Sequence, residues 1–166
     1  MRRVAQAAGI TAMALYRHYP DRDGLLNALA DSGFHDLAAR LTHVPASKSP
    51  ERYLLAILDA YLDFAFEQPH LFALMFLTRR RGARRFPADF KSRQSPTANF
   101  AAAIIAEGMK SGHFRRDDPW EITFETGALL NGMVMLYLGG RLNMQPSDFR
   151  AFCHRSFRRY FRGIRK

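Results

Sequence analysis

The sequence predicts an all-α protein in which a helix-turn-helix head is followed by a helical bundle. Two observations carry this prediction. Apolar residues recur at spacings of three and four along most of the chain, and no stretch forms a convincing strand. The first 26 residues, in addition, have the pattern of short helices separated by a glycine turn and a proline break.

The turn that organises the head lies at Gly9. Residues 4–8 end a short helix of small side chains, and Gly9 can adopt the positive φ that closes such a helix. Thr11 is a good N-cap for a second helix over residues 12–19. Pro20 ends that helix, because proline disfavours helical backbone at the residue before it and has no N–H to donate.

A third helix connects the head to the rest of the chain. Asp21 caps it, and it is expected over residues 21–42, with an apolar stripe at helical spacing formed by Leu25, Leu29, Leu37 and Leu41. Residues 44–50 then contain two prolines and two serines and are expected to form a loop. We therefore divide the chain into a head, residues 1–43, and a body, residues 44–166.

The second helix of such a head can enter the major groove of DNA. Small side chains on it would let the backbone approach base edges, and Tyr16, His18 and Arg22 could reach phosphates, which position the protein without specifying sequence. Spacing alone allows an ordinary helical hairpin equally well. The candidate DNA-binding residues are Thr11, Ala12, Met13, Ala14, Tyr16, Arg17, His18 and Arg22.

Three runs in the head resemble the signature of TetR-family transcriptional regulators: Ala8-Gly9-Ile10-Thr11, Leu15-Tyr16-Arg17-His18-Tyr19-Pro20 and Leu25-Leu26. The resemblance implies that residues 11–19 form the recognition helix. It also implies an all-helical homodimer that represses transcription from a palindromic double-stranded DNA operator and responds to a small-molecule effector.

The chain departs from the family pattern at its start. The family's DNA-binding domain opens with a complete helix, whereas this sequence opens inside the second one. We expect the missing helix to leave part of the head uncovered. The alternative function is accordingly a dimeric ligand-binding module that no longer binds DNA specifically. The side chains expected to be partly uncovered are Val4, Ile10, Leu15 and Tyr19.

The body is expected to contain five helices and one arginine-rich connection. The connection, residues 79–93, includes a glycine and a proline and is expected to be exposed and mobile. The helices are expected over residues 51–66, 71–77, 96–110, 120–142 and 147–164.

Aromatic and methionine side chains in the body have the composition of a ligand pocket, since pockets are mostly apolar and methionine adapts to irregular shapes. The same residues could simply fill a helical core. The resemblance favours a pocket for a small apolar or amphipathic effector. The candidate ligand-binding residues are Tyr61, Phe64, Phe72, Met75, Phe76, Phe100, Ile104, Phe124, Asn131 and Met133.

The last two helices carry more apolar surface than one protomer easily covers. We expect them to form an isologous four-helix interface between two copies of the chain. Arginines line one face of the final helix, so a basic membrane-surface helix is the alternative. Its aromatic residues would pack equally well in a dimer, and we expect no membrane partner.

Charge is distributed unevenly along the chain of 166 residues, whose net charge is +10. Residues 79–93 and 150–166 each contain seven lysines or arginines, with Asp89 as their single acid. This basicity would attract nucleic acid non-specifically, although both segments could be solvated basic faces, and we interpret the first one in that way.

Several function classes find no support in the sequence. Six histidines are scattered without metal-ligand spacing, and no phosphate-binding glycine loop or Ser-His-Asp motif is present, so we expect no enzyme, cofactor or metal. The lone Cys153 fits a reducing cytoplasm. The longest apolar run, residues 128–138, is too short to span a bilayer, and no secretory leader opens the chain, so we expect a soluble protein.

Overall fold

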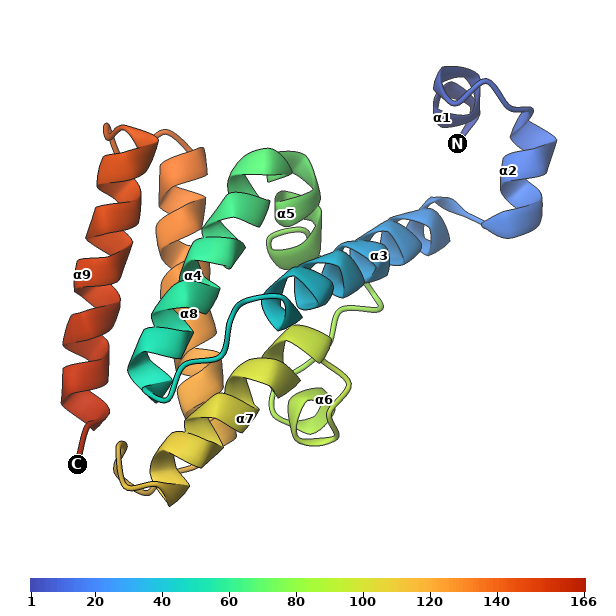
Figure 1. The fold of residues 1–166 in the computed structure, drawn as a ribbon. Helices are drawn as coiled ribbons and strands as arrows, with labels where there is room; N and C mark the ends of the chain where they lie inside the picture. The colour runs from blue at the N-terminus through green and yellow to red at the C-terminus, as the bar shows by residue number, and fades with distance from the viewer.

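The computed structural model describes residues 1–166 and is helical throughout, as predicted (Figure 1). The only strand-like pairing is one isolated bridge between Phe114 and Arg165. No helix combines the length and the apolar character needed to cross a membrane. The helices are α1 (Arg2–Ala7), α2 (Ala12–His18), α3 (Arg22–Thr42), α4 (Pro50–Glu67), α5 (Pro69–Phe76), α6 (Ala88–Lys91), α7 (Pro96–Lys110), α8 (Pro119–Leu138) and α9 (Pro146–Ile164).

The head projects from the body on a single helix. In Figure 1, α1 and α2 lie together at one end of the molecule, and α3 runs from them into the bundle formed by α4, α5 and α7–α9. α3 packs against α4, α5 and α7, while α8 lies between α7 and α9. The position of the head is therefore determined by how α3 is held in the body.

The helix starts in the head follow the predicted capping chemistry. Gly9 has a φ of 67°, the left-handed conformation that glycine adopts without strain. The Thr11 hydroxyl accepts a hydrogen bond of 3.1 Å from a backbone N–H of α2, and the Asp21 carboxylate accepts one of 2.7 Å from α3. Asp118 caps α8 in the same way, at 2.8 Å.

The predicted end of α8 near residue 142 is wrong, because the helix stops at Leu138. Gly140 follows with a φ of 69°, and the N–H of Arg141 reaches back to the carbonyl oxygen of Leu136 at 2.8 Å. This is the glycine-dependent closure that satisfies the last carbonyl groups of a helix. The helix thus ends with the apolar run, and residues 139–142 are no longer in helical conformation.

The prediction of an exposed, mobile connection over residues 79–93 is also wrong in part. It contains the short helix α6, and two of its arginines are half-buried against α3. Arg80 donates from Nη1 to Asn27 Oδ1 at 3.0 Å, and Arg84 from Nη2 to Asp31 Oδ1 at 3.0 Å. The connection is thus fastened to the helix that carries the head.

One core of 24 buried residues joins the C-terminal half of α3 to the body and includes no residue of α1 or α2. The predicted apolar stripe of α3 is correct for Leu37 and Leu41, whereas Leu29 is 46% exposed. The head–body boundary at residues 43–44 remains a prediction. One part of α3 contributes side chains to the body core, and the part nearer the head does not. The buried side chains that α3 contributes to this core are Ala30, Phe34, Leu37 and Leu41.

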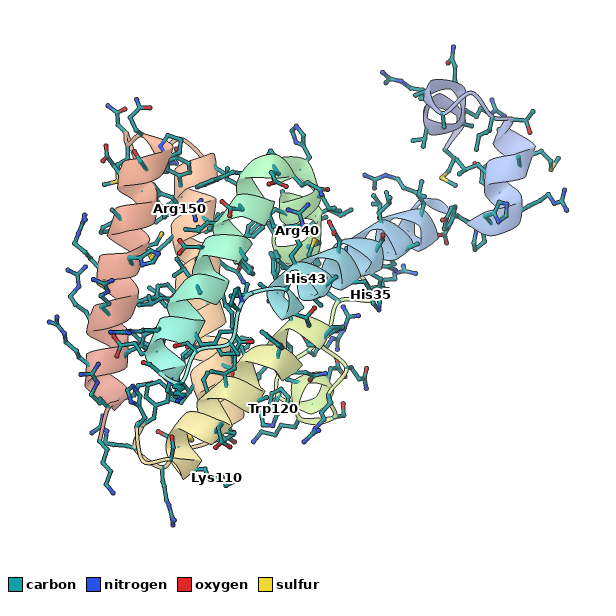
Figure 2. The ribbon with its side chains drawn as sticks, in the orientation of Figure 1. His35, Arg40, His43, Lys110, Trp120 and Arg150 are labelled. Atoms are coloured by element: carbon teal, nitrogen blue, oxygen red, sulfur yellow. The ribbon has the colours of Figure 1, made fainter.

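Ion pairs fasten two further pairs of elements. Arg150 of α9, which is labelled in Figure 2, pairs with Asp59 of α4 at 2.9 Å and also with Asp63, and His154 contacts the same Asp59 at 2.8 Å. Arg40 near the end of α3 pairs with Glu67 of α4 at 2.6 Å. α4 is therefore attached on one side to α9 and on the other to α3.

Close approach of α3 and α5 depends on Gly33. A Cβ at this position would lie 2.5 Å from Met75 Sδ and 3.1 Å from Leu71 Cγ, both on α5. Met75 is itself buried, so it has little free space into which to move. Glycine at this position allows the two helix backbones to approach closely.

We expect Gly33→Ala to lower the free energy of unfolding by about 1–3 kcal/mol, because the added methyl group overpacks the α3–α5 contact. Chemical denaturation monitored by circular dichroism measures the change. Gly163→Ala on α9 is the control, since a Cβ there meets open space and should stabilise the helix by about 0.5–1 kcal/mol. Equal stability of the two variants would contradict this account of Gly33.

Candidate functional site

The head is a small helical unit built around two buried side chains, Ala5 of α1 and Leu15 of α2. The expectation that Leu15 would be uncovered is wrong, since it is 6% exposed. Val4 and Ile10 are 47% and 46% exposed, as expected. Tyr19 is half-buried. Leu15 therefore fixes which face of α2 points outward.

The outward face of α2 presents most of the predicted DNA-binding side chains. Met13 is 74% exposed and Tyr16 is 45% exposed, and with Arg17 they share one face because helical positions three and four apart coincide. His18 is also exposed, as is Arg22 at the start of α3, and neither arginine is in an ion pair.

The predicted DNA-binding set also includes three small residues at the start of α2. Ala12 and Ala14 are half-buried, and Thr11 is exposed, with its Oγ1 used as the N-cap of α2. Their short side chains leave the backbone at the start of α2 open to a close neighbour. A protruding helix with this combination of side chains matches the geometry of a helix that enters a DNA groove.

Three of the predicted ligand residues of the body, Tyr61, Phe72 and Phe76, form a packed aromatic cluster. Tyr61 of α4 lies 5.7 Å, centroid to centroid, from both Phe72 and Phe76 of α5, which are 4.8 Å from one another. The Tyr61 hydroxyl donates to Asn131 Oδ1 of α8. Burial raises the pKa of Tyr61 well above its ordinary value, so it remains a neutral donor.

The other predicted ligand residues divide into two groups. Phe64, Met75 and Met133 are buried in the same core, and Phe100 and Ile104 of α7 pack against it from the side. Phe124 lies apart from them. It is 43% exposed on α8, and its ring stacks on that of Phe86 at 4.4 Å and meets Phe90 at 5.8 Å.

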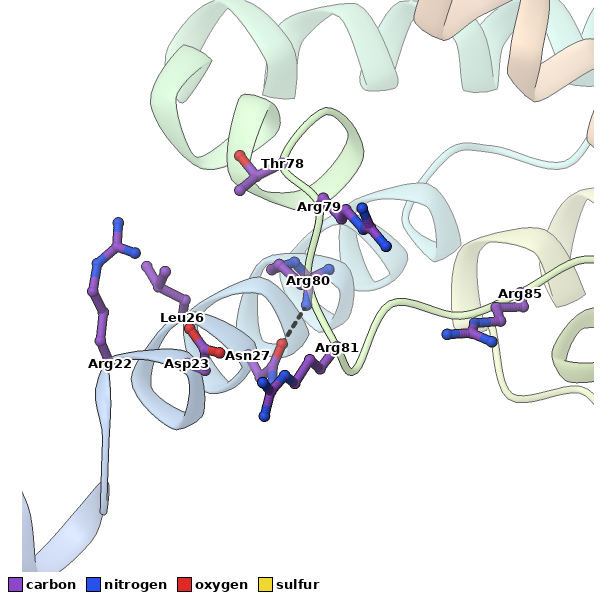
Figure 3. Close-up of a pocket in the computed structure, with 9 residues that line it drawn as sticks. All are labelled: Arg22, Asp23, Leu26, Asn27, Thr78, Arg79, Arg80, Arg81 and Arg85. Carbon is purple, nitrogen blue, oxygen red and sulfur yellow. Dashed lines mark hydrogen bonds between the residues drawn. The ribbon is translucent and has the colours of Figure 1, made fainter.

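A cavity of about 380 Å³, which the sequence pattern does not predict, lies between the N-terminal half of α3 and the segment that follows α5 (Figure 3). None of the predicted ligand residues lines it, nor the second cavity, of about 310 Å³, beside Met109. The larger one, named the arginine pocket below, is lined by Arg22, Asp23, Leu26, Asn27, Thr78, Arg79, Arg80, Arg81 and Arg85.

Cys153 and Tyr160 on α9 have raised pKa values that suit packing rather than reactivity. Burial raises the pKa of Cys153 to about 11, and its side chain is fully buried, so little thiolate forms at neutral pH. The pKa of Tyr160 is also raised, first by burial and then by its hydrogen bond of 2.7 Å to Glu125.

A helix-turn-helix head on a helical body defines a class of DNA-binding regulatory proteins. Residues 1–29 match the family model of bacterial regulatory proteins of the tetR family, and residues 54–160 match that of the tetracyclin repressor-like C-terminal domain. The chain belongs to the TetR family. It is a transcriptional regulator, and neither family match favours the alternative of a module without specific DNA binding.

Solved structures share the fold over almost the whole chain. A protein of unknown function from Rhodococcus sp. RHA1 is 27% identical, with a TM-score of 0.76 over 99% of this chain and 84% of that one. The fatty acid degradation regulator FadR of Bacillus halodurans is 14% identical, with a TM-score of 0.77 over 99% and 88%. The TetR-family regulator PfmR of Thermus thermophilus is 20% identical, with a TM-score of 0.65 over 94% and 85%. No curated protein matches the sequence.

We expect Tyr61→Phe to lower the free energy of unfolding by about 1–3 kcal/mol, because it leaves Asn131 without its donor inside the body. Urea denaturation measures the loss. Tyr53→Phe is the matched control, since the Tyr53 ring is half-buried at the start of α4, edge-on to Phe100. An equally large loss of unfolding free energy in Tyr53→Phe would mean that the hydrogen bond from Tyr61 to Asn131 does not explain the effect of Tyr61→Phe.

Proposed function

We propose that this TetR-family regulator is a homodimeric repressor of a palindromic DNA operator and that a small apolar or amphipathic effector releases it. The two α2 helices would bind half-sites about one turn of DNA apart. The observation that carries the proposal is the exposed face of α2 on a head that projects from the body.

Within the head we assign roles by side-chain chemistry. Tyr16, His18 and Arg22 contact phosphates and hold the helix in register on the duplex. Met13 and Arg17 face the groove floor together with three small residues that allow the backbone to come close to base edges. The small residues are Thr11, Ala12 and Ala14.

We place the effector among α4, α5, α7 and α8, around the hydrogen bond between Tyr61 and Asn131. A continuous set of contacts supports this location. Asn131 bonds to Tyr61, the Tyr61 ring meets Phe76, and Phe76 lies 5.2 Å, edge-on, from Phe34 of α3. A molecule inserted beside Tyr61 would therefore displace α5 against the helix that carries the head.

Release of DNA requires a difference in affinity. The effector must bind the conformation with displaced heads more tightly than the one that fits the operator, since a ligand shifts an equilibrium only by its differential affinity. The contact between α3 and α5 at Gly33 has no spare volume. A shift of α5 cannot be accommodated there, so it would move α3 and the head with it.

We place the dimer interface on α8 and α9. The outer face of α8 carries apolar side chains that nothing covers in one protomer, among them Met135 and Leu136, each exposed by 45%. A Cβ at Gly132, on the same face, would meet no neighbour. An exposed acid, Glu121, lies in the other half of α8, and four exposed arginines occupy α9: Arg155, Arg158, Arg159 and Arg162. A two-fold axis can pair such opposite charges.

We expect Tyr16→Ala and Arg22→Ala each to weaken DNA binding by a similar factor on every duplex tested, because both residues contact phosphates. Arg22→Ala should also reduce the slope of log K against log salt by about 1. Fluorescence anisotropy with DNA from upstream of the gene and with scrambled DNA, at several salt concentrations, measures both effects. The control is Arg52→Ala on the body, and unchanged affinity in both head variants would refute the assigned roles.

For the interface, we expect Met135→Glu to raise the dimer dissociation constant about 100-fold, because it places an unpaired charge in an apolar contact. Sedimentation equilibrium at micromolar protein measures the change. Leu77→Glu, at a residue 44% exposed outside α8 and α9, should leave the dimer intact. An unmodified chain that sediments as a monomer would refute the proposed interface.

A further inference from the structure

The arginine pocket is a concave site of which the proposed function uses one lining residue, Arg22. It lies where the head joins the body, and Figure 3 shows that its arginines come from two elements, Arg22 from the start of α3 and Arg79–Arg81 from the segment after α5. Leu26 is its single hydrophobic lining residue. It is therefore unsuited to an apolar effector.

Arg80 is a fixed cation at the inner side of this pocket. Its guanidinium donates to Asn27 Oδ1 at 3.0 Å, to the carbonyl oxygen of Leu74 at 3.2 Å and to that of Met75 at 3.4 Å. All three acceptors are neutral. Burial lowers the pKa of Arg80, and the nearby acid on α3, Asp31, is paired with Arg84 instead. The charge of Arg80 is therefore held in place without being neutralised by contact.

The remaining arginines add charge that no carboxylate neutralises. Arg79, Arg81 and Arg85 are exposed, and none of them is in an ion pair. Asp23 is the single acid among the lining residues. Like charges gathered around one cavity repel one another, and an anion inside it relieves that repulsion.

Arginine chemistry selects the class of anion. The planar guanidinium presents its N–H groups as a fork that matches the oxygens of a phosphate, whether a monoester with nearly two negative charges at neutral pH or a diester with one. A cavity of about 380 Å³ is at the small end of the range for small-molecule sites. The pocket thus fits a compact, multiply charged ligand.

We propose that the arginine pocket binds phosphate groups, at a site separate from the aromatic cluster around Tyr61. Two sources can supply them, a small phosphorylated molecule or the backbone of bound DNA. In either case the anion bridges α3 and the segment after α5, because Arg22 lies on the first and Arg79–Arg81 on the second. This assignment goes beyond the proposed function and its first test uses no DNA.

The test compares the full chain with Arg79→Gln/Arg81→Gln and with the matched control Lys48→Gln/Arg52→Gln, which removes the same charge from exposed positions on the body. Isothermal titration with inorganic pyrophosphate at low ionic strength is the first arm. We expect the unmodified chain and the control to bind alike and the pocket variant to bind at least about tenfold more weakly. Circular dichroism checks that all three fold equally.

The second arm measures the salt dependence of duplex DNA binding for the same three proteins. Loss of pyrophosphate binding in the pocket variant, with DNA binding equal to the control, identifies a free phosphorylated ligand. No pyrophosphate binding by any protein, with a DNA salt slope smaller by about 2 in the pocket variant than in the control, identifies backbone phosphates. A pocket variant that matches the control in both arms overturns the proposal.

Discussion

The insertion of the C-terminal half of α3 into the body is the interaction on which the rest of the structure depends. Ala30, Phe34, Leu37 and Leu41 form a stripe of buried side chains at helical spacing, and no residue of α1 or α2 shares their core. The head is thus positioned by packing some distance away. About 13 residues of α3, or roughly 20 Å at 1.5 Å per residue, separate the middle of this stripe from Arg22, so a tilt of roughly 5° at the stripe moves that end by ~2 Å.

Contacts with α3 converge from several elements of the body. α5 contributes Met75 against Gly33, α4 contributes Glu67 against Arg40, and the segment after α5 contributes Arg80 against Asn27. The first is apolar and closely packed, the second is an ion pair, and the third is a hydrogen bond to a neutral amide. Ligands of different chemistry can therefore act on the same helix from different sides.

Local chemistry made much of the fold predictable. The caps at Thr11 and Asp21 and the turn at Gly9 depend on residues within three or four positions, so the sequence indicates them directly. The pairing of Arg80 with Asn27 spans 53 positions and that of Tyr61 with Asn131 spans 70. Such contacts arise only from tertiary packing. The charge pattern of residues 79–93 alone therefore predicts a solvated connection. In the folded chain, part of that segment lines the arginine pocket.

The isolation of the head from the body core has a further consequence for how this regulator can diverge. Substitutions on the outer face of α2, at Met13 or Tyr16, touch no residue of the main core and leave its packing intact. Changes around Tyr61 in turn leave the surface of α2 unaltered. Operator sequence and effector chemistry can thus evolve independently in one polypeptide, with α3 as the shared element that both must conserve.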